Sequence, residues 1–161
     1  MSITTSESPR PPAELPAALV ALVEDFHALG PAQRLEMLVE LGEQVADVPE
    51  PYASDTSLME RVEECQSPVF VVVEVAPAAP HAVTVHYSAP PEAPTTRGFA
   101  GVLTEGLADL DADAVLAVPS DLPERLGLGG LISPLRLAGM ASMLGRVQRQ
   151  VRDAVVEAPG G

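Results

Sequence analysis

Lysine is missing from this chain, and its absence excludes several kinds of chemistry. All nine basic residues are arginine. Without lysine the chain cannot form the Schiff base that holds pyridoxal phosphate, and it cannot contain the phosphate-binding loop that ends in Gly-Lys. The nine arginines face 23 Asp and Glu residues, which gives a formal net charge of −14. Such an acidic protein repels a phosphate backbone, so we expect no nucleic-acid binding.

Only one cysteine, Cys65, is present. One thiol cannot form a disulfide within the chain, and alone it cannot bind zinc or an iron–sulfur cluster, because both need several ligands. The three histidines, His27, His81 and His86, have no spacing that makes a ligand pair. We therefore expect neither a metal nor a cofactor. A lone thiol can still act as a nucleophile or carry a covalently bound group.

Aromatic residues and long apolar runs are also scarce. With three Phe, two Tyr and no Trp, the core has to be built from Val, Leu, Ala and Met. No apolar run reaches the roughly 20 residues of a membrane helix, and the first residues lack the basic and apolar segments of a signal peptide. We expect a cytoplasmic protein that does not bind membranes, in a compartment where a free thiol stays reduced.

The domain organisation follows from length and composition. A chain of 161 residues suits one domain. Residues 1–14 are rich in Ser, Thr and Pro, which predicts a disordered tail. We expect the domain to span residues 15–156 and a short tail to occupy residues 157–161. Either a monomer or a homodimer fits this organisation.

Two amphipathic helices are predicted at the start of the domain. The first runs from residue 15 or 16 to about Leu29, and the second from Pro31 to about Val45, with apolar side chains at helical spacing in each. Gly30-Pro31 separates them, because proline suits the first turn of a helix. Two such helices with a tight break predict an αα-hairpin.

A small antiparallel sheet is predicted next. Residues 58–62 suggest a short strand, and the run from Val69 to Val75 is rich in β-branched residues, which favour strands. Its nearly continuous apolarity predicts burial on both faces. After a Pro-rich turn, apolar and polar residues alternate from His81 to Ser88. We expect these two runs to pair as a hairpin.

Helices are predicted again in the last part of the chain. Thr95 or Thr96 can cap a helix that reaches Leu110, and Ser133 followed by proline starts a helix that reaches about Val155. Two short helices, at residues 113–118 and 123–126, lie between them. The order of elements predicts an α+β fold, in which a sheet of two or three antiparallel strands carries helices on one face.

Cys65 stands among polar residues directly before the apolar strand. A free cysteine is most often a small buried hydrophobic residue. The polar neighbours Glu64, Gln66 and Ser67 instead predict a loop in which solvent reaches the thiol. Glu63 and Glu64 should raise the pKa of the thiol above its ordinary value, so that a cation, backbone donors or a partner is needed to activate it.

Arg136 is the candidate for the activating cation. It lies in the first turn of the last predicted helix, where the helix dipole disfavours a positive charge. A residue kept in an unfavourable place can have a function there. The alternative is an ordinary surface arginine.

Taken together, these segments resemble the SufE family of sulfur-acceptor proteins over roughly residues 17–152. The strongest piece is Cys65-Gln66-Ser67 running into an apolar strand. Four more pieces follow the family pattern in order: Arg34…Leu38…Glu40-Leu41-Gly42, Thr96-Arg97-Gly98-Phe99, Arg125-Leu126-Gly127-Leu128 and Ser133-Pro134-Leu135-Arg136…Gly139-Met140. The chain departs from the family at Glu64, where many members have glycine, and at residues 92–96, where many have Asp-Ser-Asp.

The resemblance implies a function for Cys65. A cysteine desulfurase that uses pyridoxal phosphate would pass sulfane sulfur to Cys65 as a persulfide, and the chain would hand that sulfur to an iron–sulfur scaffold complex. Two other classes remain open. A cysteine hydrolase would need a histidine base and a group that orients it, and no histidine here lies in a recognisable motif. A pure interaction module would have an inert Cys65.

Overall fold

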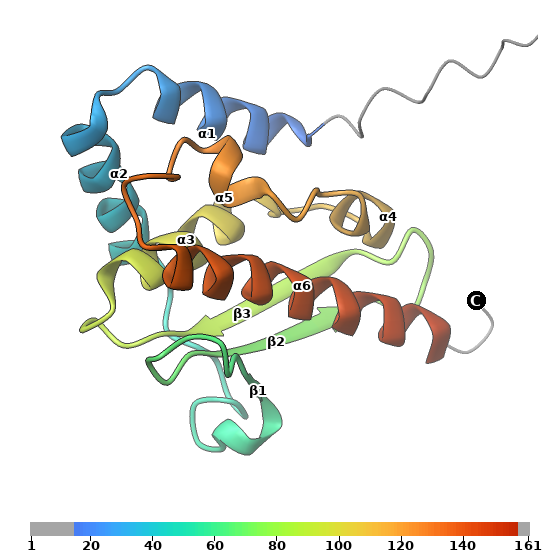
Figure 1. The fold of residues 1–161 in the computed structure, drawn as a ribbon. Coiled ribbons are helices and arrows are strands. Elements are labelled where there is room, and N and C mark those ends of the chain that lie inside the picture. Colours follow the sequence, from blue (N-terminus) through green and yellow to red (C-terminus); the bar gives the residue numbers. More distant parts are fainter. Residues whose placement is uncertain (1–14, 158–161) are drawn as a thin grey trace, which may run out of the picture.

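The computed structural model describes residues 15–157. The predicted disordered tail at residues 1–14 lies outside this range, as does most of the predicted C-terminal tail. The predicted α+β architecture is confirmed: N-terminal helices precede a three-stranded antiparallel sheet, and further helices follow it (Figure 1). The elements in chain order are α1 (Ala17–His27), α2 (Pro31–Glu43), the 3₁₀ helix η2 (Thr56–Leu58), β1 (Glu60–Arg61), β2 (Phe70–Val75), β3 (Val83–Ser88), α3 (Pro94–Gly106), α4 (Ala112–Leu116), α5 (Leu122–Arg125) and α6 (Pro134–Glu157).

The sheet has the order β1-β2-β3, with each neighbouring pair antiparallel. Its register places Val71 opposite Tyr87 and Val75 opposite Val83, so these side chains share the face that meets the core. The other face of β2 is only half-buried at Phe70 and Val72 and is exposed at Glu74. The predicted burial of this strand on both faces is therefore wrong. One face meets helices, whereas no helix of residues 15–157 covers the other.

The long helix α6 crosses the core face of the sheet and packs along β2 (Figure 1). Its buried side chains recur at helical spacing: Met140, Met143, Leu144, Val147 and Val151. Ser133 begins the helix as predicted, because its hydroxyl accepts a hydrogen bond from the backbone N–H of Arg136 at 3.3 Å. Within residues 15–157, α6 and the other helices all fall short of the length and apolarity needed to cross a membrane.

Helix α3 runs through the middle of the helical layer and packs closely against α2. The approach depends on glycine. A Cβ atom on Gly98 would lie 2.3 Å from the carbonyl oxygen of Leu38, and one on Gly101 would lie 2.3 Å from that of Leu41. The two predicted N-terminal helices and the break between them are present, but both pack more on α3 than on each other.

Helix α3 begins differently from the prediction. Pro94 occupies its first turn, and the residue before the helix makes no side-chain capping bond. Thr95 and Thr96 therefore lie inside the helix, because proline is already suited to a first turn and lacks the N–H that a cap would satisfy. The helix also ends at Gly106, short of Leu110, and Asp109 just beyond it has a φ of 64°. A left-handed residue at that point is incompatible with helix.

Two arginines fasten the helices to neighbouring loops through backbone carbonyl groups. The guanidinium of Arg34 donates to the carbonyl oxygens of Phe26, Leu29 and Gly127. That of Arg97 donates to the carbonyl oxygens of Gly42, Val45 and Ala89. A guanidinium has five N–H donors in one plane, so a single side chain can satisfy carbonyl groups from several segments.

Candidate functional site

A cavity of about 80 Å³ lies where three segments of the chain meet. One is the loop between β1 and β2, the second is the segment that leads into α3, and the third is the start of α6. Both predicted site residues line this cavity. Its lining consists of Glu64, Cys65, Gln66, Ser67, Glu92, Ala93, Pro94, Thr95, Thr96, Leu135, Arg136 and Gly139.

Cys65 lies in the loop between β1 and β2, as predicted, but it is buried there, with 7% of its surface exposed. The loop is narrow. Val62 donates its N–H to the carbonyl of Val69 at 2.8 Å, and Cys65 donates its own N–H to the carbonyl of Val62 at 3.1 Å. Glu64 and Gln66 on either side are exposed. The prediction of a solvent-reached thiol is therefore wrong, because this one side chain turns inward.

Gly139 of α6 makes room for the thiol. The Sγ atom of Cys65 lies 3.8 Å from the carbonyl oxygen of Gly139, within reach of a weak S–H donor. A Cβ atom on Gly139 would lie 3.2 Å from that Sγ and 3.5 Å from the carbonyl oxygen of Glu64. The absence of a side chain at this position thus sets how closely the loop and the helix approach.

Burial raises the pKa of the Cys65 thiol above its ordinary value, and the charge of Glu64 raises it further. The guanidinium of Arg146 opposes both effects. The direction agrees with the sequence prediction, but desolvation is a larger cause than the neighbouring carboxylate. At neutral pH the thiol is therefore mostly protonated and a weak nucleophile.

Arg136 lies at the cavity with its side chain exposed. Within residues 15–157, the guanidinium of Arg136 takes part in no hydrogen bond or ion pair, so it can turn toward an anion in the cavity. Sequence reasoning missed Arg146, the cation whose charge lowers the thiol pKa. The only sequence signal for it is helical spacing, because Gly139, Ser142 and Arg146 follow one another along one side of α6.

Two helix N-termini border the cavity, those of α3 and α6. The N–H groups of a first helical turn have no acceptor within the helix, and the helix dipole places partial positive charge there. Both effects favour an anion in the cavity. The site therefore disfavours the thiolate through burial and Glu64 but offers donors to a negative group that sits in the cavity.

Histidine and metal chemistry have no support at this site. His27 bonds to the carbonyl of Arg125, His81 to the carbonyl of Ala76, and His86 to the carboxylate of Glu74. None of the three lines the cavity. Over residues 15–157, His, Cys, Asp and Glu side chains do not come together in groups of three or more that could hold a metal ion.

Comparison with known proteins identifies the chain. Residues 20–151 match the SufE family, described as an Fe-S metabolism associated domain. The chain is 47% identical over 143 residues to uncharacterized SufE-like proteins from two strains of Mycobacterium tuberculosis, which covers 89% of this chain and 97% of each relative. It is also similar to the solution structure of a hypothetical protein from Thermus thermophilus, with a TM-score of 0.77 and 36% identity, covering 89% of this chain and 100% of the other. The chain therefore belongs to the SufE family, whose domain is associated with Fe-S metabolism.

Proposed function

We propose that this chain is a sulfur carrier for iron–sulfur cluster assembly. Cys65 accepts sulfane sulfur from a cysteine desulfurase. The chain thereby stimulates that enzyme, because it removes the product, and it passes the sulfur to a scaffold complex. The observation that carries the proposal is the environment of the Cys65 thiol. Cys65 sits in a small cavity bordered by two helix N-termini and Arg136, and no histidine lines that cavity.

The chemistry is a thiol exchange at sulfur. The thiolate of Cys65 attacks the terminal sulfur of a persulfide on the desulfurase. A new S–S bond forms at Cys65, the S–S bond of the donor breaks, and the donor cysteine leaves as a thiolate. The electrons balance without an external oxidant or reductant. Attack by a thiolate of the scaffold on the Cys65 persulfide repeats the step and restores the Cys65 thiolate.

The size of the cavity suits this cargo. A cavity of about 80 Å³ has room for one added sulfur atom. A persulfide anion held there would lie between the N-terminal ends of α3 and α6 and close to Arg136. Arg136 would bind or orient that anion.

The chain needs a partner to obtain sulfur. It has no lysine, so it cannot hold the pyridoxal phosphate with which a desulfurase releases sulfur from cysteine. A cysteine hydrolase is disfavoured because no histidine lines the Cys65 cavity. An interaction module would differ from a sulfur carrier in one respect, since its Cys65 would take up no sulfur.

The test is to mix the purified chain with a cysteine desulfurase and cysteine and to weigh the intact protein. We expect an added mass of about 32 Da, one sulfur atom, that a thiol reductant removes. Reversal by reductant separates a persulfide from a sulfinic acid, which has a similar added mass but is not reduced by thiols. The Cys65→Ser variant should gain no mass and should not stimulate the desulfurase. Failure of the parent chain to gain sulfur would exclude the relay.

Arg136 is tested in the same assay. Arg136→Ala should slow the gain of sulfur severalfold while leaving the melting temperature unchanged, since the side chain is exposed. Arg152→Ala is the control, because Arg152 is an exposed arginine of the same helix that does not line the cavity. A normal transfer rate with a lowered melting temperature would instead make Arg136 a structural residue.

A further inference from the structure

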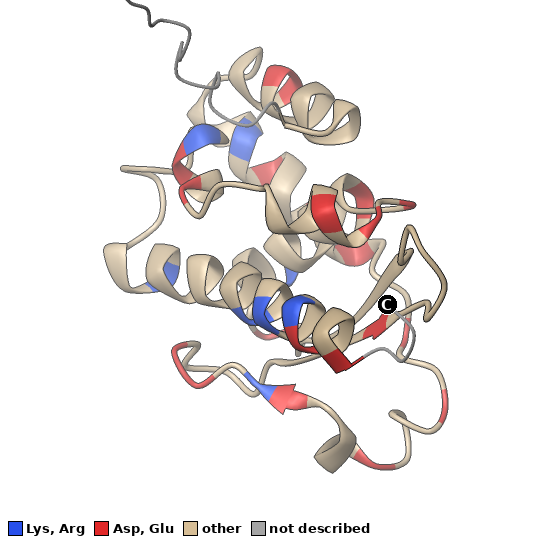
Figure 2. Cartoon of the chain, turned by 90° about the vertical axis from the view of Figure 1, so that its right-hand side faces the viewer, with Lys and Arg blue, Asp and Glu red and all other residues tan. Residues whose placement is uncertain are grey.

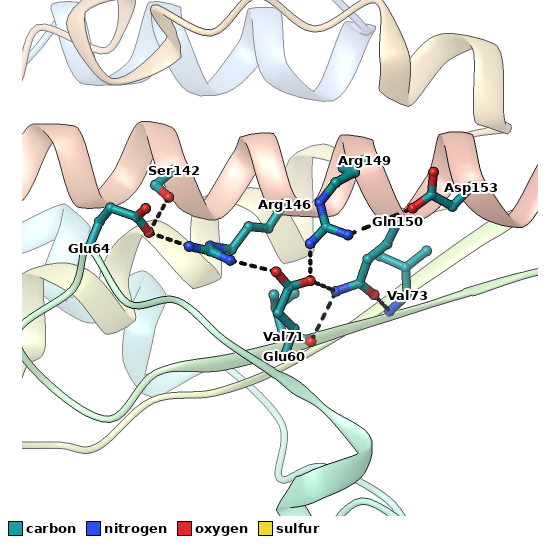
Figure 3. Close-up of polar contacts among 9 residues, drawn as sticks. All are labelled: Glu60, Glu64, Val71, Val73, Ser142, Arg146, Arg149, Gln150 and Asp153. Carbon is teal, nitrogen blue, oxygen red and sulfur yellow. Dashed lines mark hydrogen bonds and ion pairs between the residues drawn. The ribbon is translucent and has the colours of Figure 1, made fainter.

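The side chain of Glu64 connects the loop that carries Cys65 to α6 (Figure 3). The Oε1 atom of Glu64 accepts a hydrogen bond from the hydroxyl of Ser142 at 2.6 Å and one from Nη2 of Arg146 at 2.7 Å. Glu64 is directly next to Cys65 in the chain. Both donors lie on the side of α6 that also presents Gly139 to the thiol.

Glu60 of β1 makes a second set of bonds to α6, and it is less exposed than Glu64. Nη1 of Arg146 bonds to Glu60 of β1, which Arg149 and Gln150 also contact. The Oε1 atom of Gln150 in turn accepts a hydrogen bond from the backbone N–H of Val73 at 2.9 Å. Glu60 is 26% exposed, whereas Glu64 is 49% exposed. The bonds of Glu60 thus attach β1 to the helix, those of Gln150 attach β2, and those of Glu64 attach the loop alone (Figure 3).

The loop has few other attachments to α6. Within residues 15–157, the hydrogen bonds and ion pairs between residues 63–68 and this helix are those of Glu64 and the weak contact of the Cys65 thiol with Gly139. The side chain of Glu64 therefore supplies the strong polar bonds that hold the loop against the helix.

We infer that Glu64 is a positioning residue, whose bonds to Ser142 and Arg146 hold Cys65 in its buried position until they are released. The inference rests on the proposed function, because a thiol that exchanges sulfur with another protein has to become accessible. When the bonds break, the loop leaves the helix and the thiol turns toward solvent. Glu64 thereby acts on the reaction through the position of Cys65 and makes no contact with the transferred sulfur.

The experiment measures alkylation of Cys65 by iodoacetamide as a function of pH in the isolated protein. The profile gives the apparent pKa of the thiol and the rate constant reached above it, where every thiol is ionised. The pKa reports the local charges, whereas the limiting rate constant reports access to the sulfur. The charged side chains that face the thiol or line its cavity are Glu64, Glu92, Arg136 and Arg146.

Two variants separate position from charge. Ser142→Ala removes a bond of Glu64 without changing any charge, so it should raise the limiting rate constant about three- to tenfold and leave the pKa nearly unchanged. Arg146→Ala should raise the limiting rate constant similarly although it raises the pKa, because a nearby cation is lost. If Arg146 acted on Cys65 by charge alone, only the pKa would change, and the inference would be wrong.

Arg149→Ala is the matched control. It removes an arginine of the same helix that pairs with Glu60 and Asp153 and does not contact the loop. Its limiting rate constant should equal that of the parent. If Arg149→Ala increased this rate constant as much as Arg146→Ala does, the cause would be a general destabilisation of α6, and the inference would be wrong. Should Arg146→Ala fail to fold, Glu64→Ala replaces it, because it removes both bonds, and the same rise in the limiting rate constant is expected. Alkylation is measured without a desulfurase. Its result therefore tests the role of Glu64 even if the chain takes up no sulfur in the desulfurase assay.

Discussion

Glu64 is the residue whose charge the fold stabilises most clearly. The Ser142 hydroxyl and the Arg146 guanidinium hold the pKa of its carboxyl at about 2. In the unfolded chain the pKa is near 4.3. The folded value is the lower one, so the carboxylate contributes stability at pH values above about 4.3, and this contribution is lost as the pH falls toward 2.

The pH dependence of stability follows from this shift. Glu64→Gln should unfold at a lower temperature than the parent at pH 7, because the variant lacks the ion pair. The difference in melting temperature should stay constant down to about pH 5 and then shrink as the pH falls from about 4.3 toward 2. Melting curves recorded by circular dichroism at each pH check this. A difference that grows on acidification would mean that the carboxylate is not stabilised by its partners.

Single residues also show where sequence reasoning ends. The polar neighbours of Cys65 correctly predicted a loop, and Ser133-Pro134 correctly predicted a helix start, because both signals are local. The burial of the thiol depends on Gly139, which lies 74 residues later, and the charge of Glu64 is paired with Arg146, 82 residues later. No local pattern reports such contacts. The role of Arg136 at the cavity stays a prediction.

At the scale of elements, the close contact between α2 and α3 limits which side chains the chain can accommodate at the helix interface. Gly98 and Gly101 face backbone atoms of α2, which cannot move aside as the end of a flexible side chain can. Strand β2 illustrates a limit of prediction at this scale. Its β-branched residues identified the strand correctly, but composition did not reveal that helices cover only one of its faces.

Glycine-to-alanine exchanges test this packing. Gly98→Ala should lower the free energy of unfolding by about 3 kcal/mol or more, since the new methyl group would overlap the backbone of Leu38. Gly145→Ala is the control on α6, where nothing lies within 4 Å of the added Cβ. It should raise the free energy of unfolding by up to about 1 kcal/mol, the gain in helix propensity. Urea denaturation measures both values. Equal effects of the two exchanges would contradict the packing argument.

At the scale of the whole molecule, charge is distributed unevenly. Figure 2 shows acidic segments spread over many elements, while basic segments gather on α6. The four arginines of that helix are Arg136, Arg146, Arg149 and Arg152. Arg146 and Arg149 are paired with the carboxylates that face them. Asp153 and Glu157 are the only acidic residues of α6, so this helix is net positive and the excess of carboxylates lies on the other segments.

Repulsion among these carboxylates should make stability depend on salt. Raising NaCl from about 10 to 150 mM shortens the Debye length from about 30 to 8 Å, which screens repulsion between distant like charges. We expect the melting temperature to rise by a few degrees, even though the exposed ion pairs weaken slightly. Differential scanning fluorimetry at constant pH checks the change. A fall in melting temperature would mean that the ion pairs outweigh the repulsion.

The tight contact between α2 and α3 also bears on how this protein can be altered. In a library of random variants screened only for folded protein, Gly98 and Gly101 should tolerate almost nothing, because the space above them is already filled by backbone. The exposed residues 63 and 66 should tolerate nearly any substitution in the same screen. The reactivity of the thiol could thus be tuned through its flanking residues while the scaffold stays intact, and designed variants could hold Cys65 more or less firmly without a redesign of the core.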